Sequence, residues 1–228
     1  MIFPRLRPKW DTVLTGLLVV CAVVTTMVVV WQQFLKSPPP VAEDQKPVYF
    51  SQWKDFLSKG VLIGSPEARV KIVEFGDFEC PFCAVFHQEY RKLRERYPDD
   101  VALVYVHLPL PGHRFAMPAA RAAECANEQG HFASMHDRLL QGQEQFGLKP
   151  WAEFATEAKV PNVEQFNTCM TREAAPSRVV EGKRLAEQLD IAATPTLIIN
   201  GLKVSAPNSQ ELNKIVSRTL STGLPRTG

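Results

Sequence analysis

The 228-residue chain has almost no excess of charge of either sign, with 26 Lys and Arg residues against 24 Asp and Glu residues. The small surplus lies in residues 1–47, and residues 48–228 are neutral overall. A protein that binds nucleic acid needs a surplus of Lys and Arg on one face to neutralise the phosphates. The composition therefore argues against a nucleic-acid partner.

Cysteine is also scarce, and the five residues are too few for a small domain that disulfides alone hold together. The chain has no internal repeat and no low-complexity tract beyond three consecutive prolines at residues 38–40. Charged residues make up 22% of the chain and hydrophobic residues 45%. This balance excludes a disordered chain and leaves enough apolar material for one domain with a core.

The twenty residues 12–31 carry no charge and are rich in Val, Leu and Thr. As a helix it would extend about 30 Å, which is the thickness of the hydrocarbon core of a bilayer. A cleaved signal peptide is the alternative, but the stretch exceeds the roughly 7–15 apolar residues of such a peptide and no small-x-small site follows it. More basic residues precede the stretch than follow it closely. We therefore expect residues 1–11 in the cytoplasm and a single transmembrane helix that contacts the lipid bilayer.

The rest of the chain is predicted to form a linker over residues 32–47 and a folded domain over residues 48–228. The prolines of the linker favour an extended spacer. In the domain, apolar patterns predict a strand at residues 69–75, a helix at residues 80–97 and a second buried strand at residues 101–108. This order predicts a βαβ unit with parallel strands, and hence the α/β class.

A run of five predicted helices follows, within about residues 112–190. Two short strands at residues 196–205 then flank Asn200-Gly201, which is a strong signal for a two-residue hairpin turn. Asn208 is suited to cap a final helix. The helical segment is therefore an insertion between two groups of strands.

Cys80 and Cys83 are separated by two residues where the first strand passes into the first helix. The partial positive charge of a helix N-terminus stabilises a thiolate at Cys80, and the spacing brings the second thiol within disulfide reach. We expect Cys80 to be an exposed nucleophile and Cys83 to be the resolving thiol. A zinc site with His87 is one alternative, although it lacks a fourth ligand. A structural disulfide is another, although its small ring constrains the unfolded chain weakly.

Thr194 and Pro195 open the first strand of the predicted hairpin. A trans proline is unfavourable at the start of an apolar strand, and a cis proline is usually a selected feature. The residues alone leave open an ordinary proline at the entry to a strand.

Four segments together resemble the DsbA family of thiol–disulfide oxidoreductases, and most of all its membrane-anchored branch. They are residues 64–67, 73–83, 119–126 and 193–201. The resemblance implies a thioredoxin fold with an inserted helical subdomain, and it implies no cofactor. It also implies that Pro195 is cis and faces the cysteine pair, with Thr194 beside it. The buried acid of the family corresponds to Glu74, for which an exposed strand residue remains the alternative.

The chain departs from the family pattern at Phe82. The strongest oxidants of the family have a histidine between the two cysteines, whereas Phe82 donates neither a charge nor a hydrogen bond to the Cys80 thiolate. We therefore expect backbone amides to hold the thiolate, with a less depressed pKa and a less oxidising disulfide. Thr194, where oxidases of the family often carry Val, leaves an isomerase or a reductase open.

Cys125 and Cys169 each lie on the apolar face of a predicted helix in the insertion. In an oxidising compartment we expect them to form a structural disulfide rather than two buried free thiols. The ring would contain over forty residues and would stabilise the fold by roughly 3–4 kcal/mol. The expectation depends on the compartment and not on geometry.

The sequence thus predicts a thiol–disulfide oxidoreductase anchored in the inner membrane, with its catalytic domain on the periplasmic side. It would exchange disulfides with cysteines of exported proteins. The resemblance implies a membrane redox partner, either a quinone-linked reoxidase or an electron donor. A reductase or isomerase of the opposite redox poise stays open. So does a non-catalytic binding or chaperone module with a structural disulfide.

Overall fold

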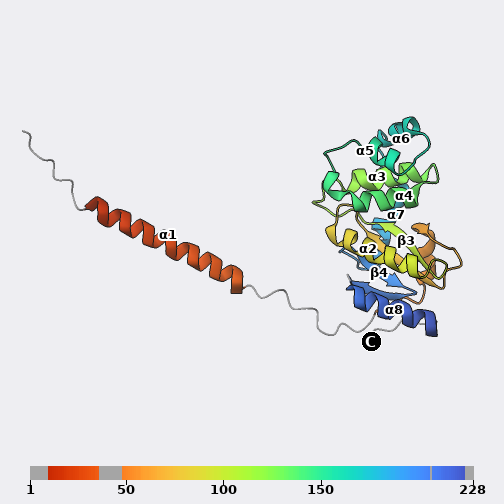
Figure 1. Ribbon diagram of the computed structural model, residues 1–228, viewed down its shortest axis with the longest axis horizontal. Coiled ribbons are helices and arrows are strands. Elements are labelled where there is room, and N and C mark those ends of the chain that lie inside the picture. The colour runs from red at the N-terminus through yellow and green to blue at the C-terminus, as the bar shows by residue number, and fades with distance from the viewer. Residues whose placement is uncertain (1–9, 36–47, 206, 224–228) are drawn as a thin grey trace, which may run out of the picture. The chain divides into compact units, whose positions relative to one another are not determined.

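The computed structural model describes residues 10–35, 48–205 and 207–223. The chain divides into two compact units, Met1–Lys46 and Pro47–Gly228. The first contains helix α1, Trp10–Leu35 (Figure 1). Within the described residues, no helix combines the length and the apolar character that crossing a membrane requires. The transmembrane span predicted over residues 12–31 is therefore not supported by the described residues.

A five-stranded sheet in the order β1-β3-β2-β4-β5 forms the centre of the second unit. Its strands are β1 (Val61–Ile63), β2 (Val70–Gly76), β3 (Val101–His107), β4 (Thr196–Ile199) and β5 (Leu202–Ser205). Strands β2 and β3 are parallel, and every other neighbouring pair is antiparallel. Helix α2 (Pro81–Arg96) connects the parallel pair. The predicted βαβ unit is therefore confirmed.

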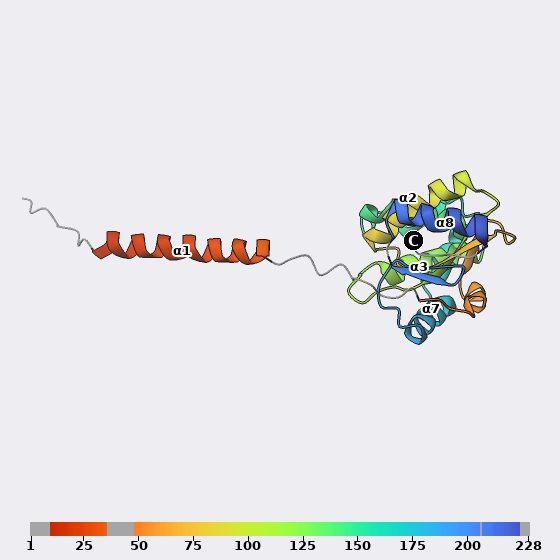
Figure 2. The same cartoon turned by 90° about the horizontal axis from the view of Figure 1, so that it is seen from below.

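Helices cover both faces of the sheet. Helices α2 and α8 (Ser209–Thr222) pack on one face, whereas α7 (Ser177–Gln188) and the 3-10 helix η1 (Trp53–Ser58) pack on the other (Figure 2). All seven residues of β3 are buried. A strand that is covered on both faces has no solvent side, and for this reason its sequence is a continuous apolar run rather than an alternation.

The helical insertion between β3 and β4 gathers at one end of the sheet (Figure 1). It consists of α3 (Ala116–Asn127), α4 (Phe132–Gln141), the 3-10 helix η2 (Gln143–Gln145), α5 (Trp151–Glu157) and α6 (Val163–Met170). The inserted helical subdomain is therefore confirmed, and α7 is the last helix between β3 and β4. Helix α7 packs against β3. Gly182 permits this approach, because a Cβ at that position would lie 2.2 Å from the carbonyl oxygen of His107.

Local sequence signals mark the turns and the helix starts of the domain. Asn200 and Gly201 both have positive φ, 43° and 99°, and close the hairpin of β4 and β5 as predicted. The side chains of Asn162 and Asn208 cap α6 and α8 by accepting backbone hydrogen bonds. Strand β1 was not predicted, because its three residues are too few to show a pattern.

Candidate active site

The cysteine pair lies where β2 passes into α2. Cys80 is the N-cap residue of α2, with extended backbone angles, and Pro81 follows in the first turn. The carbonyl oxygen of Cys80 accepts the first helical hydrogen bonds, from the amides of Cys83 at 3.1 Å and Ala84 at 3.3 Å. Both thiols are free. The helix terminus therefore presents its unpaired amides and its partial positive charge to the sulfur of Cys80.

The expectation that Cys80 is exposed is wrong. The residue is 4% exposed and Cys83 is completely buried. The loop before β4 lies against Cys80. The Cys80 thiol donates a hydrogen bond to the carbonyl oxygen of Thr194 over 3.3 Å. The Thr194-Pro195 peptide bond is cis. Two segments that are 114 residues apart in the sequence thus meet at one end of the sheet.

The two thiols have opposite acidities. The thiol of Cys83, by its hydrogen bond, contributes most to lowering the pKa of Cys80 to about 5. The Thr194 side chain and the amides of Cys83 and Phe82 add to the effect, and burial opposes it. Burial raises the pKa of Cys83 far above its usual range, and Cys80 and Glu74 raise it further. At neutral pH, Cys80 is therefore a thiolate and Cys83 a thiol. The second thiol, rather than the helix amides, contributes most to holding the thiolate.

Glu74 is a buried residue of β2, with 1% exposure. Its neighbours Val73 and Phe75 belong to the core beneath α7. Side chains alternate across a strand, so Glu74 faces the opposite layer, which contains α2. Both carboxyl oxygens lack a hydrogen-bond partner. The structure therefore excludes the alternative that Glu74 is an exposed strand residue.

The carboxyl group of Glu74 is electrostatically linked to both thiols. Burial raises the pKa of Glu74 well above 4.5, the charge of Cys80 raises it further, and Cys83 opposes this increase. A carboxyl group with such a pKa retains its proton where an ordinary glutamate has lost it. Glu74 therefore holds its proton more tightly than an ordinary glutamate does.

Asp77, the first residue after β2, was not among the predicted site residues. Its backbone amide donates to the sulfur of Cys83 over 3.4 Å, and its carbonyl oxygen accepts from the amide of Cys80 over 3.1 Å. The residue is 1% exposed. Its main chain therefore holds both cysteines, a role that no local sequence pattern reveals.

The side chain of Asp77 joins this segment to the loop that follows β3. Its Oδ1 accepts from the amide of Glu79 over 2.8 Å. Its Oδ2 accepts from the amide of Leu110 over 2.9 Å and lies 2.7 Å from Nδ1 of His113. The carboxylate of Glu79 accepts from the amide of Phe115 in turn. The β3–α3 loop is therefore fastened to the active-site loop at three points.

Gln143 of η2 connects the insertion to the active site and was also not predicted. Its Nε2 donates to the carbonyl oxygens of Phe78 over 2.7 Å and Cys80 over 2.9 Å. Gln143 lies 63 residues from Cys80 in the sequence, and no local sequence pattern predicts this contact.

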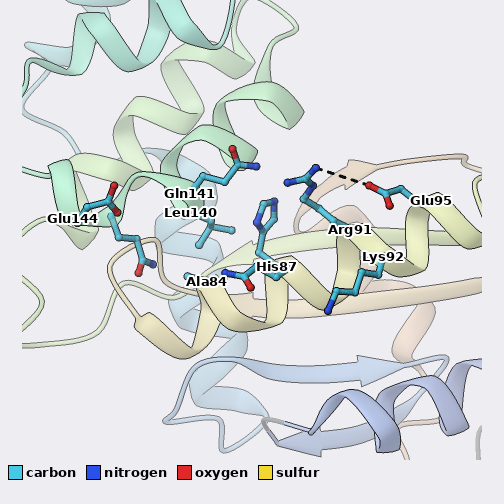
Figure 3. A pocket seen from close by; sticks show the side chains of 10 residues that line it. Ala84, His87, Arg91, Lys92, Glu95, Leu140, Gln141 and Glu144 are labelled. Carbon is cyan, nitrogen blue, oxygen red and sulfur yellow. Dashed lines mark ion pairs between the residues drawn. The ribbon is translucent and has the colours of Figure 1, made fainter.

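A cleft of about 570 Å³ borders the outer side of α2. Ala84, directly after Cys83, and His87 line it from α2, and Leu140 lines it from α4 (Figure 3). Figure 3 also shows the ion pair of Arg91 and Glu95 in this cleft, with 3.9 Å between nitrogen and oxygen. The cleft therefore adjoins the cysteine helix along one of its faces.

The zinc alternative for the cysteine pair is not supported. Nε2 of His87 lies 2.8 Å from Oδ1 of Asp137, to which Arg94 is also paired. In the described part of the chain, the one group with the spacing of metal ligands consists of His87, His136 and Asp137, and it contains no cysteine. The His87 ring thus contacts Asp137, in a polar cluster between α2 and α4.

Cys125 and Cys169 are joined by a disulfide in the structure. Their Cα atoms lie 5.7 Å apart, and the bridge connects α3 with α6 within the insertion. Both residues are buried. The bridge is therefore separate from the cysteine pair at the start of α2.

A family model described as thioredoxin matches residues 57–218. The chain belongs to this thioredoxin family. Among solved structures, a thioredoxin-like oxidoreductase from Silicibacter pomeroyi DSS-3 is 26% identical, with a TM-score of 0.59 over 72% of this chain and 94% of the other. The thiol-disulfide exchange protein alpha-DsbA2 from Wolbachia pipientis is 20% identical, with a TM-score of 0.63 over 74% of this chain and 92% of the other. The predicted thioredoxin fold and its likeness to DsbA are confirmed at the level of the fold.

Curated sequences also contain similar regions. A sequence named Na(+)/H(+) antiporter NhaA 1, from Mycolicibacterium gilvum, is 35% identical over 147 residues. This match covers 63% of the present chain and 24% of the antiporter sequence. The chain thus spans about a quarter of the length of the curated relatives that it matches. The transport activity in that name is stated of the antiporter and not of this chain.

Proposed function

We propose that the protein is a thiol–disulfide oxidoreductase of the DsbA type, with Cys80 as its reactive thiol and Cys83 as its resolving thiol. The asymmetry of the pair is the observation that carries this proposal. Cys80 lies at a helix terminus with a pKa of about 5, while burial raises the pKa of Cys83. A structural disulfide needs no such difference, whereas exchange needs one stable thiolate and one thiol held in reserve.

In the oxidising direction, the thiolate of a client attacks the Cys80 sulfur of the Cys80–Cys83 disulfide. That S–S bond breaks, a new S–S bond forms between the client and Cys80, and the electron pair passes to Cys83, which takes up a proton. Glu74 is the acid in position to supply this proton. A second client thiolate then attacks the client sulfur of the mixed disulfide and releases Cys80 as a thiolate. The client loses two electrons, and the cysteine pair gains them.

The surface around the pair suits a polypeptide client. The side chains of Phe82 and Val85 are apolar and 66% and 59% exposed. Both belong to the first turns of α2, beside Cys80. The backbone at Thr194 and Pro195 lies next to the sulfur, where an extended client segment adds as a strand. We therefore propose cysteines of exported, incompletely folded proteins as the substrates.

The low pKa of Cys80 supports an oxidase rather than a reductase. A stabilised thiolate favours the reduced pair, so its disulfide is a stronger oxidant. An oxidase requires a membrane partner that removes the electrons, for which a quinone-linked reoxidase has the appropriate chemistry. A measured reduction potential near that of thioredoxin, about −270 mV, would instead favour the reductase and an electron donor as the partner.

We propose an extracytoplasmic location for the domain. The bridge of Cys125 and Cys169 supports it, because disulfides persist in oxidising compartments. The uncharged sequence of residues 12–31 suggests a membrane anchor, which stays a prediction from the sequence. Alkaline extraction of cell membranes tests the anchor, and protease protection in spheroplasts tests the side on which the domain lies. Release of the full chain by alkali would contradict the anchor.

A trapping experiment tests the exchange mechanism. Cys83→Ser removes the resolving thiol, so we expect mixed disulfides between Cys80 and client proteins to accumulate on non-reducing gels. Cys80→Ser removes the nucleophile, so we expect neither exchange nor trapped clients. The double variant of Cys125 and Cys169 to Ala is the matched control, because it removes two cysteines outside the site. Trapping by Cys80→Ser instead of Cys83→Ser would reverse the assignment of the two roles.

A further inference from the structure

His113 lies in the loop after β3, opposite the start of α2. Its Nδ1 is 2.7 Å from Oδ2 of Asp77. The His113 side chain is 30% exposed, whereas that of Asp77 is completely buried. The pair thus consists of a buried carboxylate and a partner that exchanges protons with solvent.

The side chain of Asp77 belongs to the segment that holds both cysteines. The main chain of Asp77 contacts the sulfur of Cys83 and the amide of Cys80. Its carboxylate therefore lies close to the Cys80 thiolate. Two negative charges in a site of reduced dielectric repel each other and raise the free energy of the thiolate. Amides of Glu79 and Leu110 also donate to the carboxylate, but they carry no net charge. An imidazolium at His113 is the one arrangement of these partners that neutralises Asp77.

The charges that face His113 come from two elements. Asp77 and Glu79 belong to the segment after β2, and Cys80 belongs to the start of α2. The hydrogen bond to Asp77 contributes most to raising the pKa of His113, the charges of Asp77, Glu79 and Cys80 add to it, and partial burial opposes them. The cationic form therefore persists to a higher pH than in an ordinary histidine.

We propose that His113 is a positioning residue for disulfide exchange: through Asp77 it supplies the positive charge that stabilises the Cys80 thiolate. This inference rests on the proposed function of the cysteine pair. Phe82, between the cysteines, provides no charge, so a residue from the loop after β3 takes over that contribution. The redox poise of the pair is thereby coupled to the protonation of a histidine 33 residues away in the sequence.

The sign of the coupling follows from the charges. Below the pKa of His113 the Asp77–His113 pair is neutral, so the thiolate is favoured and the disulfide is more oxidising. As the pH increases through that pKa, the pair becomes negative, and the thiolate loses this stabilisation. By reciprocity, a thiolate at Cys80 must raise the pKa of His113 relative to its value in the oxidised protein.

His113→Gln separates the charge from the hydrogen bond, because the amide of glutamine still donates to Asp77. Because one positive charge is lost from a partly screened site, we expect the acid dissociation constant of Cys80 to fall about three- to tenfold. The equilibrium constant for oxidation of glutathione should fall by a similar factor, and a tenfold fall corresponds to about 30 mV. Thiolate absorbance of the full chain measures the first quantity, and equilibration with glutathione buffers measures the second.

Two further variants serve as controls. His113→Lys retains a cation that donates to Asp77, and it should restore most of the acidity of Cys80. His131→Gln removes a histidine of the insertion that is paired with the carbonyl oxygen of Ala158, and it should change neither quantity. If His113 merely holds the loop through its hydrogen bond, His113→Gln will behave as the unaltered protein, and the inference is overturned.

A measurement on the unaltered protein is independent of how well the variants fold. NMR titration of the His113 ring should give a higher pKa in the reduced protein than in the oxidised protein, and an equal pKa in the two states would overturn the inference. Failure of the unaltered chain to equilibrate with glutathione would instead contradict the proposed function. The two failures are therefore distinguishable.

Discussion

Glu74 offers a test in which stability and reactivity are expected to change in opposite directions. Its carboxyl group is buried, and neither oxygen has a hydrogen-bond partner. An unsatisfied buried polar group costs about 1–3 kcal/mol. Glu74→Leu replaces the carboxyl group with methyl groups of similar volume. We therefore expect the free energy of unfolding of the reduced protein to increase by about 1–3 kcal/mol at mildly acidic pH.

The difference in the free energy of unfolding between Glu74→Leu and the unaltered protein should also grow with pH. The pKa of Glu74 in the folded state lies well above its ordinary value of 4.5, so the folded protein binds more protons than the unfolded chain. The contribution of Glu74 to the stability of the unaltered protein must then fall as the pH increases above 4.5, until the folded-state pKa is reached. The limiting slope is about 1.4 kcal/mol per pH unit. Glu74→Leu removes this decrease, so its advantage should be larger at pH 7 than at pH 5.

Urea denaturation of the reduced full chain, followed by tryptophan fluorescence at both pH values, measures these differences. Glu153→Leu, at an exposed position of α5, is the control for the change of residue type and should show no such pH dependence. Thiol–disulfide exchange should slow in Glu74→Leu, because Cys83 loses its proton donor. A variant that is less stable than the unaltered protein, or whose advantage is the same at pH 5 and pH 7, would refute the reasoning.

Three other outcomes are expected. Alkylation of the reduced protein by iodoacetamide should occur first at Cys80, with a rate that increases with pH around a midpoint near 5. Equal rates at Cys80 and Cys83 would favour a non-catalytic module. Phe82→His should lower the pKa of Cys80 further and raise the reduction potential, by about 30 mV for each tenfold change in the equilibrium constant. An unchanged titration curve of the Cys80 thiol would contradict this expectation. Replacing Cys125 and Cys169 by Ala removes a bridge between residues that are 44 apart in the sequence, and it should lower the free energy of unfolding by about 4 kcal/mol. The reactivity of Cys80 should be retained. An unchanged melting temperature would count against a structural bridge.

Elements whose signals lie within a few residues of one another could be predicted from the residues alone. Asn200-Gly201 closes a hairpin because both residues tolerate positive φ, and this preference does not depend on the rest of the chain. The position of Cys80 at the start of α2 is likewise local, since it follows from a strand, a proline and a helical apolar pattern in sequence. The relation of the cysteine pair to a helix terminus was therefore predictable.

The surroundings of the cysteine pair depend on contacts between segments that are distant in the sequence. Thr194 covers Cys80 from 114 residues away, and this contact made the predicted exposure of Cys80 wrong. The contacts of Asp77 with His113 and of Gln143 with Cys80 join segments separated by 36 and 63 residues. A periodic pattern reports which face of an element is buried, but it does not report which residue of another element meets that face. The electrostatics of the site depend on those meetings, and for that reason the sequence located the cysteines while the fold set their acidity.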